Sequence, residues 1–222
     1  GDEIVPTEAR LKIGQVRDIN SYSLGAQAED AHAAPIYLGL IKDSLEELNQ
    51  AVAKGLELAD TVILSGGSSV GVRDFTVDSF TSFPGSEILV HGVSVSPGKP
   101  TILARLGNKS LWGLPGHAVS AMITFDLFLK PLLERLSGEF IEKPGFGKRL
   151  TAVLSRKVPS VHGREDYIRV KVETRPDGGI VAYPVLGKSG LISTMVKADG
   201  LVRIGLNEEG LDKGTEVTVL LF

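Results

Sequence analysis

The stretch that decides the fold reads Asp60-Thr-Val-Ile-Leu-Ser-Gly-Gly-Ser-Ser-Val-Gly-Val-Arg-Asp74. An apolar run over residues 61–64 ends abruptly in a loop of glycine and serine, which predicts a buried strand that delivers a hydroxyl-rich loop at its carboxyl end. Glycines let a backbone approach an anion closely, and exposed N–H groups and serine hydroxyls can bond its oxygens. Asp74 adds a carboxylate near the same rim.

Two later loops have the same character. They read Ser96-Pro-Gly-Lys-Pro100 and Gly113-Leu-Pro-Gly-His-Ala-Val-Ser-Ala121. The second opens a long helical pattern, and the amino-terminal end of a helix attracts anions through free N–H groups and the helix dipole. Any one Gly/Ser loop is usually a turn. Three of them in order within one domain-sized stretch predict a mouth that binds phosphate or another oxyanion.

Length, cysteine count and net charge limit the classes of protein to which the chain can belong. The chain has 222 residues, no cysteine and a formal net charge of −3. It is long enough to bury roughly 70% of its unfolded surface, so the core needs no disulfides, and a thiolate metal site is excluded. Charges of both signs give no case for a nucleic-acid partner or an anionic membrane. No apolar run approaches the ~20 residues of a membrane span and no signal peptide opens the chain, so we expect a soluble, cytoplasmic protein.

The first part of the chain alternates helical and strand patterns. Helices are expected over residues 21–31 (capped by Asn20 or Asp18), 44–59, 76–83 and 119–136, and strands over 35–40, 61–64, 87–95, 101–106 and 109–114. This alternation predicts a three-layer α/β domain with a largely parallel sheet and right-handed crossovers. Ligands of such domains lie beyond the carboxyl ends of the strands, where the Gly/Ser loops fall.

The composition and the secondary-structure pattern change after residue 140. Residues 137–147 are rich in glycine, proline and charge, and shorter strand patterns follow at 150–154, 167–173, 179–182, 201–204 and 216–222. Pro176-Asp-Gly-Gly179 predicts a hairpin turn between two of them. We therefore expect two domains: an α/β domain over residues 1–140, and a small all-β domain over 148–222 that forms a barrel or a sandwich.

These motifs together resemble those of the molybdopterin molybdenumtransferases, the family that includes the gephyrin E-domain. The resemblance rests on Gly1-Asp2-Glu3, the loop at 65–71 with Asp74, Pro97-Gly-Lys-Pro100 and the Gly113–Ala121 loop, and it covers nearly the whole chain. The α/β part alone also suits a molybdopterin adenylyltransferase, whereas the appended β domain favours the molybdenumtransferase. That family has two further amino-terminal domains and a strand that runs into Gly1-Asp2-Glu3. The resemblance therefore implies a fragment or a truncated homologue.

The resemblance implies a Mg²⁺-dependent reaction. Adenylylated molybdopterin is cleaved, molybdate is handed to the pterin dithiolene, and AMP is released. Tungstate is an alternative oxyanion, since both are tetrahedral dianions of similar size. The resemblance also implies a homodimer that shares its site between chains, with molybdopterin adenylyltransferase as a candidate partner.

Three carboxylates match acidic positions of the family's site: Glu3, Asp43 and Asp74. They are the candidate catalytic residues and metal ligands, because carboxylates can hold Mg²⁺ through water while the ion bridges a pyrophosphate. Two of them have an ordinary structural alternative. Asp43 precedes Ser44 as a common helix-start residue, and Asp74 can be a helix cap. Glu3 lies at the start of the chain.

The remaining candidates follow the loops. The resemblance places substrate binding at Ser65, Gly66, Gly67, Ser68, Ser69, Gly71, Gly98, Lys99, Pro115, Gly116, His117 and Ser120, and oxyanion binding at Lys99, Pro100, Arg169 and Ser189. Two positions depart from the family pattern. Ser96 stands where the family usually has a second lysine, and His117-Ala118 stands where it usually has Asn-Pro.

Structural alternatives remain for these residues as well. Lys99 between Gly98 and Pro100 is either a cation held toward an anion or a solvated surface side chain. His117 and Ser120 either serve the ligand or belong to the first turn of a helix. Arg169 either meets the oxyanion or pairs with Glu165 or Asp166 at the surface.

Three functional hypotheses follow from the sequence. The first is an enzyme of molybdenum insertion, or the larger part of one. The second is a truncated homologue that binds the pterin nucleotide or a protein partner without turnover, which Ser96 favours. The third is an adenylyltransferase that uses ATP. Their products distinguish them: AMP from adenylylated pterin, no product, or pyrophosphate from ATP.

Overall fold

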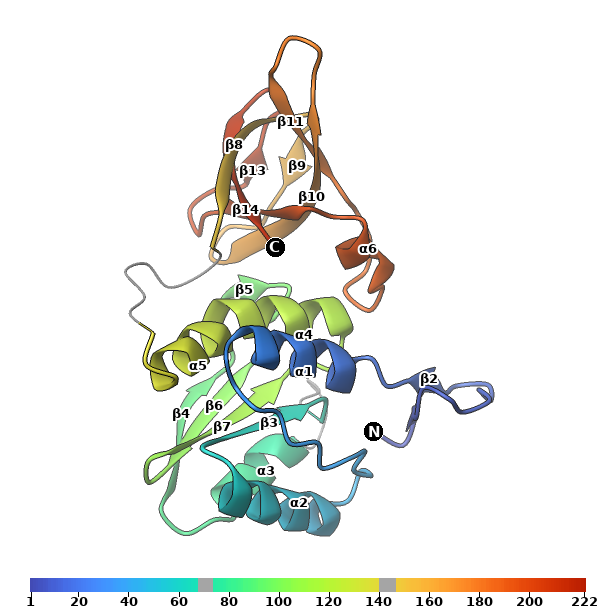
Figure 1. Ribbon diagram of the computed structural model, residues 1–222, viewed down its shortest axis with the longest axis vertical. Helices are drawn as coiled ribbons and strands as arrows, with labels where there is room; N and C mark the ends of the chain where they lie inside the picture. Colours follow the sequence, from blue (N-terminus) through green and yellow to red (C-terminus); the bar gives the residue numbers. More distant parts are fainter. Residues whose placement is uncertain (68–73, 140–146) are drawn as a thin grey trace.

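The computed structural model describes residues 1–67, 74–139 and 147–222. Ser68, Ser69 and Gly71 of the first loop lie outside the described residues. Figure 1 shows two parts: a sheet flanked by helices, followed by a β barrel that carries the carboxyl terminus. The predicted class, an α/β domain followed by a small barrel-like β domain, is confirmed.

The α/β part contains a four-stranded sheet. Its strands are β3 (Thr61–Ser65), β7 (Lys109–Leu114), β6 (Ile102–Leu106) and β4 (Ser86–His91), in the order β3-β7-β6-β4. The β3–β7 pair is parallel, whereas β7–β6 and β6–β4 are antiparallel. The expectation of a largely parallel sheet was therefore wrong, and the sheet is mixed.

The linkers explain this difference. Only Gly107 and Asn108 separate β6 from β7, and a connection of two residues can make a hairpin but not a crossover. Gly107 adopts a positive φ of 61°, as such tight turns often require. The long connection from β3 to β7 leaves room for parallel pairing, so the two Gly/Ser loops after these strands emerge at the same edge of the sheet.

Helices cover both faces of this sheet (Figure 1). On one face lie α1 (Asn20–Asp30) and a long helical run made of α4 (Ala118–Thr124), a π-helical turn (Phe125–Leu129) and α5 (Lys130–Leu136). On the other lie α2 (Leu45–Leu58) and α3 (Phe75–Thr81). Each face has its own apolar core, one around Trp112 and Phe125 and one around Phe80 and Ile102. The three expected layers are present.

The segment over residues 35–40 was expected to be a strand and is not one. Its apolar residues suit a strand, but a strand needs a hydrogen-bonding partner. Within the described ranges, β3 pairs only with β7, and residues 35–40 pair with no strand. A short parallel pair, β1 (Ile4–Val5) with β2 (Val16–Arg17), precedes α1.

The second part is a closed barrel. Its strands are β8 (Arg149–Leu154), β10 (Glu165–Thr174), β11 (Ile180–Pro184), β12 (Gly200–Ile204) and β14 (Glu216–Leu221). They follow the order β11-β8-β14-β12-β10, and pairing of β10 with β11 closes the ring. Alternate residues face an apolar interior that includes Val170, Ala182 and Val219. A small pair, β9 (Val158–Pro159) with β13 (Gly210–Leu211), and the short helix α6 (Ser193–Val196) complete this part.

The two parts share a sheet and a core. β5 (Val95–Ser96), which precedes the Pro97–Pro100 turn, pairs in parallel with the start of β10. A shared apolar cluster joins Val119 and Ile123 of α4 to Tyr167 and Leu201 of the barrel. The turn that carries Lys99 and the barrel loops are thus fixed relative to each other.

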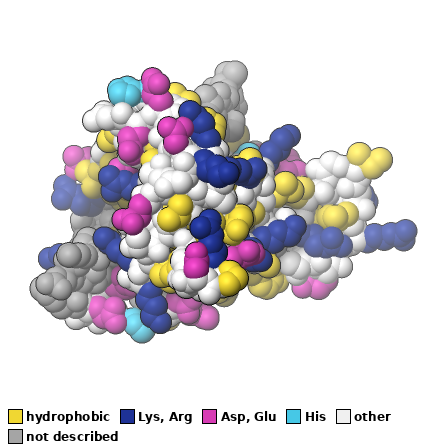
Figure 2. All heavy atoms as spheres, turned by 90° about the horizontal axis from the view of Figure 1, so that it is seen from above, with side chains coloured by type: hydrophobic (Ala, Val, Ile, Leu, Met, Phe, Trp, Pro, Cys, Tyr) yellow, Lys and Arg dark blue, Asp and Glu magenta, His cyan; other side chains and the backbone are white. Residues whose placement is uncertain are grey.

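The surface is mixed in charge. On the face drawn in Figure 2, lysine and arginine side chains lie among acidic and hydrophobic ones. Among the helices that the structure describes, none has the length and hydropathy that crossing a bilayer would require.

Candidate functional site

A large cleft of about 2350 Å³ brings most of the predicted site residues together. It lies where the carboxyl ends of β3 and β7 face the Pro97–Pro100 turn and the barrel. The predicted residues that line it are Glu3, Asp43, Ser65, Gly66, Gly67, Gly98, Lys99, Pro100, Pro115, Gly116, His117, Ser120 and Ser189. Asp74 and Arg169 are predicted residues that do not line it.

Hydrogen bonds tie together the loops that follow β3 and β7. The Gly66 N–H donates to the Leu114 carbonyl over 3.1 Å. Asn20 Nδ2 donates both to Ser65 Oγ (2.6 Å) and to the Gly116 carbonyl (2.9 Å), and so bridges the two loops. The sequence indicated Asn20 only as a helix cap. The sequence signal for this bridging role was the position of Asn20, a polar residue at the start of a helix.

Glycine is required at two points of the cleft. Gly66 and Gly67 have φ angles of 95° and 75°, a region that other residues rarely adopt. At Gly98, φ is 137°, and an added Cβ would lie 2.3 Å from Cγ2 of Thr124. These positions keep the backbone bare where it borders the cleft, which suits close approach of an anion.

Two hydrogen bonds hold the turn that carries Lys99. The Val93 N–H donates to the Lys99 carbonyl over 2.9 Å, and Thr101 Oγ1 donates to the Gly98 carbonyl over 2.7 Å. The Ser96–Pro97 peptide bond is cis. The Lys99 side chain itself is exposed and lines the cleft. It is therefore a cation on a fixed backbone, available to an anionic ligand.

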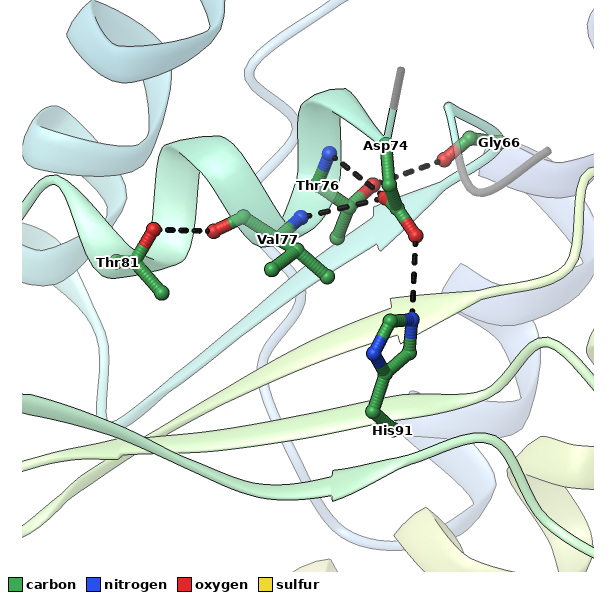
Figure 3. Close-up of polar contacts among 6 residues, drawn as sticks. All are labelled: Gly66, Asp74, Thr76, Val77, Thr81 and His91. Carbon is green, nitrogen blue, oxygen red and sulfur yellow. Dashed lines mark hydrogen bonds and ion pairs between the residues drawn. The ribbon is translucent and has the colours of Figure 1, made fainter. Parts of the chain in front are cut away.

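Asp74 caps a helix (Figure 3). Its Oδ1 accepts from the N–H groups of Thr76 (3.2 Å) and Val77 (3.3 Å) at the start of α3, while Oδ2 lies 3.5 Å from His91 Nε2. Because a cap of this kind explains the aspartate by itself, its role as a metal ligand stays a prediction.

Glu3 and Asp43 line the cleft at its other side. The Asp43 side chain is half-exposed, and its Oδ2 accepts from the Asp2 N–H over 3.3 Å. Among the described residues, no group of three histidine, cysteine or acidic side chains could hold a metal. Mg²⁺ usually takes only one or two carboxylates together with phosphate oxygens and water. Glu3 and Asp43 fit that arrangement, whereas Asp74 does not line the cleft.

The start of α4 meets the barrel loop that carries Ser189. His117 is the residue before the helix, and its Nδ1 lies 2.9 Å from Ser189 Oγ. The Val119 N–H donates to the Ser189 carbonyl over 3.0 Å. Ser120, in the first turn of the helix, is almost fully buried at 4% exposure. Sequence reasoning named these residues separately, whereas their direct contact across the two domains appears only in the fold.

Arg169 is a buried cation without a carboxylate. Only 9% of the residue is exposed, its Nη2 donates to the Gly187 carbonyl over 2.9 Å, and its Nε has no hydrogen-bond partner in the described part of the chain. Burial lowers the pKa of Arg169 from its ordinary value. A buried, incompletely bonded guanidinium is costly unless an anion satisfies it.

The surface ion pairs proposed as the alternative for Arg169 do not form. Glu165 instead pairs with Arg203 over 3.1 Å. Asp166 accepts from Ser160 Oγ and pairs with Arg164 over 3.1 Å. Burial alone would raise the pKa of Asp166, but hydrogen bonds from Ser160, Ser96 and Arg164 bring it below its ordinary value. Arg169 therefore bonds the Gly187 carbonyl of its neighbouring loop and not these two carboxylates.

The fold and cleft define a class of protein: an α/β domain whose Gly/Ser loops converge on one cleft, joined to a five-stranded barrel. Comparison with known proteins places the chain within that class. Residues 1–135 match the family model described as "Probable molybdopterin binding domain", and residues 151–222 match "MoeA C-terminal region (domain IV)". The chain belongs to the molybdopterin-binding domain family.

Relatives of the chain have related names. It is 29% identical to the molybdopterin molybdenumtransferase of Bacillus subtilis and 32% identical to that of Haemophilus influenzae, covering 100% and 99% of this chain but 50% and 54% of theirs. The crystal structure of a molybdopterin biosynthesis MoeA protein from Pyrococcus horikosii superposes with a TM-score of 0.84 at 35% identity, over 99% of this chain and 52% of that one. The chain spans about half the length of these relatives.

Proposed function

We propose that the protein takes part in molybdenum-cofactor biosynthesis, as a molybdopterin molybdenumtransferase or the part of one that holds the pterin nucleotide and molybdate. The observation that carries the proposal is the cleft, where the Ser65–Gly67 loop, the Gly98–Pro100 turn and the Pro115–Ser120 loop meet. Bare N–H groups, serine hydroxyls and Lys99 provide donors for phosphate oxygens, and the names of relatives support a molybdopterin ligand as the source of these oxygens.

The proposed reaction cleaves the phosphoanhydride of adenylylated molybdopterin as molybdate reaches the dithiolene, and it releases AMP. In this proposal, Lys99 neutralises phosphate or molybdate oxygens, while Asn20 and the glycines hold the loops at the right spacing. Mg²⁺, held by Glu3 and Asp43 with phosphate oxygens, would supply charge neutralisation at the bond that breaks. Asp74 remains a third candidate ligand.

The oxyanion part of the proposal centres on the loop between β11 and α6. Arg169 bonds the backbone of this loop at Gly187, and Ser189 lines the cleft from it. The unsatisfied Nε of Arg169 supports an anion nearby, since a guanidinium bonds the oxygens of tetrahedral anions well. Molybdate and tungstate both fit this chemistry.

Product analysis tests the function. The purified protein would be incubated with adenylylated molybdopterin, molybdate and Mg²⁺, and AMP would be measured. AMP release supports the molybdenumtransferase, and tight binding without AMP indicates the binding module. Pyrophosphate formed from ATP and molybdopterin would indicate the adenylyltransferase instead.

A matched pair of lysine variants sharpens this test. Lys99→Met removes the cation of the cleft and keeps the length of the side chain, and we expect pterin-nucleotide affinity to fall about tenfold. Lys213→Met removes an exposed lysine of the barrel that lies outside the cleft, and it should leave affinity unchanged. Equal affinities for the two variants would count against the cleft as the binding site.

We further propose that the protein acts as a cytoplasmic homodimer, with molybdopterin adenylyltransferase as the candidate donor of its substrate. Exposed large apolar side chains in the first 60 residues support an association surface there: Leu11, Ile13, Val16, Tyr22, Ile36, Tyr37, Leu40, Leu45 and Leu58. Sedimentation equilibrium should give twice the mass of 23.6 kDa. A monomer at high concentration would contradict the dimer.

A further inference from the structure

His117 and Ser189 meet across the two domains inside the cleft. The imidazole Nδ1 lies 2.9 Å from the serine Oγ, and the Ser189 carbonyl accepts from the Val119 N–H over 3.0 Å. Two residues at the start of α4 therefore hold this serine: His117 contacts its side chain and Val119 bonds its backbone. Both side chains line the cleft.

The number of hydrogens available makes this contact informative. A serine hydroxyl has one hydrogen, and a neutral imidazole has one N–H. If Nδ1 carries no proton, it must accept the serine hydrogen, and Ser189 Oγ can offer only lone pairs to the cleft. If Nδ1 carries a proton, it donates to Oγ, and the serine hydrogen is free to point at a ligand. An imidazolium has protons on both nitrogens, so it enforces the second state.

We propose that His117 is a positioning residue that decides whether the Ser189 hydroxyl donates into the cleft, so that protonation of His117 strengthens capture of a tetrahedral oxyanion. The imidazolium contributes twice, because it frees the serine hydrogen and adds a positive charge. The inference rests on the proposed oxyanion site. It also gives a consequence to the departure at residue 117, since an asparagine amide always has donor hydrogens, whereas Nδ1 of a neutral histidine can lack one.

Other charged groups act in the same cleft. Lys188 adjoins Ser189 in the chain, and the other basic, acidic and histidine residues that line the cleft are Arg17, Lys42, Lys99, Arg164, His32, His162, Glu3, Asp18, Asp43 and Asp60. Histidine is the side chain whose ordinary titration falls between about pH 5 and 8. His32 and His162 are the other two histidines that line the cleft, so both serve as controls.

Calorimetric titration with tungstate tests the inference at constant ionic strength, at about pH 6 and about pH 8, on either side of the ordinary histidine pKa. We expect the wild type to bind tungstate about tenfold more tightly at the lower pH, as one added charge-assisted hydrogen bond predicts. His117→Asn should bind with the same affinity at both pH values. Ser189→Ala should bind more weakly at both and show a smaller difference. The controls His162→Gln and His32→Gln should each keep the wild-type difference.

The outcomes separate this inference from the proposed function. If the wild type binds tungstate but shows no pH difference, or if His117→Asn keeps that difference, the inference is wrong while the oxyanion site stands. Loss of the difference in His162→Gln or in His32→Gln would show that this histidine, and not His117, causes the effect, and the inference would be wrong. Absence of tungstate binding at both pH values would overturn the oxyanion site and the inference with it.

Discussion

Asp126 shows at the residue scale how a partly buried carboxyl group affects stability. It lies in the π-helical turn, where Gln27 Nε2 donates to its Oδ1 over 2.8 Å. Burial raises the pKa of Asp126 from 3.8 to about 6, although the bond from Gln27 opposes the shift. The folded state therefore binds the proton more tightly than the unfolded state, and stability falls as pH rises through this interval.

We predict that Asp126→Asn removes this pH dependence and stabilises the protein at pH 7 by about 1–3 kcal/mol. The asparagine oxygen can still accept from Gln27, so the local hydrogen bond is kept. Urea denaturation of both proteins at several pH values measures the difference. Equal stabilities at neutral pH would mean that Asp126 is solvated in the folded protein.

At the same scale, we predict that Arg169 favours ligand binding but does not stabilise the fold. Arg169→Met removes a buried, incompletely bonded cation and keeps its bulk, so we expect the free energy of unfolding to hold or to rise by about 1 kcal/mol. Tungstate affinity should fall at least about tenfold, because the guanidinium is the donor proposed for the oxyanion. Denaturation and calorimetry on one preparation measure both quantities. A large loss of stability would instead assign Arg169 to holding the Gly187 loop.

At the scale of elements, helix α3 allows the two readings of Asp74 to be separated. Asparagine caps helices about as well as aspartate, so Asp74→Asn should keep the free energy of unfolding within about 0.5 kcal/mol, whereas Asp74→Ala should lose about 1 kcal/mol. If Asp74 also holds Mg²⁺, Asp74→Asn should lower AMP release far more than nucleotide affinity, since the metal acts chiefly on charge that develops in the transition state. Full AMP release by Asp74→Asn would leave Asp74 as a helix cap alone.

Element boundaries also bear on how the chain divides. Helix α5 ends at Leu136 and β8 begins at Arg149, so we propose that the domain boundary lies between them, as the composition of residues 137–147 indicates. β5 is the exception, because it lies within the α/β part of the sequence and pairs with barrel strand β10.

At the scale of the whole molecule, the shared core predicts cooperative unfolding. Ile123 is fully buried in the cluster that joins α4 to the barrel. Ile123→Ala should lower the free energy of unfolding by about 2–4 kcal/mol through lost burial and a cavity. Trp112, the single tryptophan, reports on the α/β part by fluorescence, while circular dichroism reports on the whole chain. The two curves should coincide in the wild type, and separate transitions would show that the domains unfold independently.

The sequence by itself determined the features that depend on short, local patterns of residues. Three features were enough to predict an α/β domain, a β domain and a shared anion-binding site. They are the apolar run that ends at Ser65, the glycine positions and the change of secondary-structure pattern near residue 140. The strand over residues 109–114 was predicted at its observed bounds. These features are readable because hydrophobic periodicity and glycine placement act over a few residues.

Only the tertiary structure decided what depends on distant neighbours. The mixed pairing of the sheet, the absence of a strand at residues 35–40, the bridge made by Asn20 and the contact of His117 with Ser189 each join segments far apart in the chain. The same holds for Arg169, whose possible carboxylate partners lie close in sequence but pair with other arginines. Sequence spacing specifies which side chains are available, but their partners are chosen by how strands and loops pack, and that choice is made only in the folded chain.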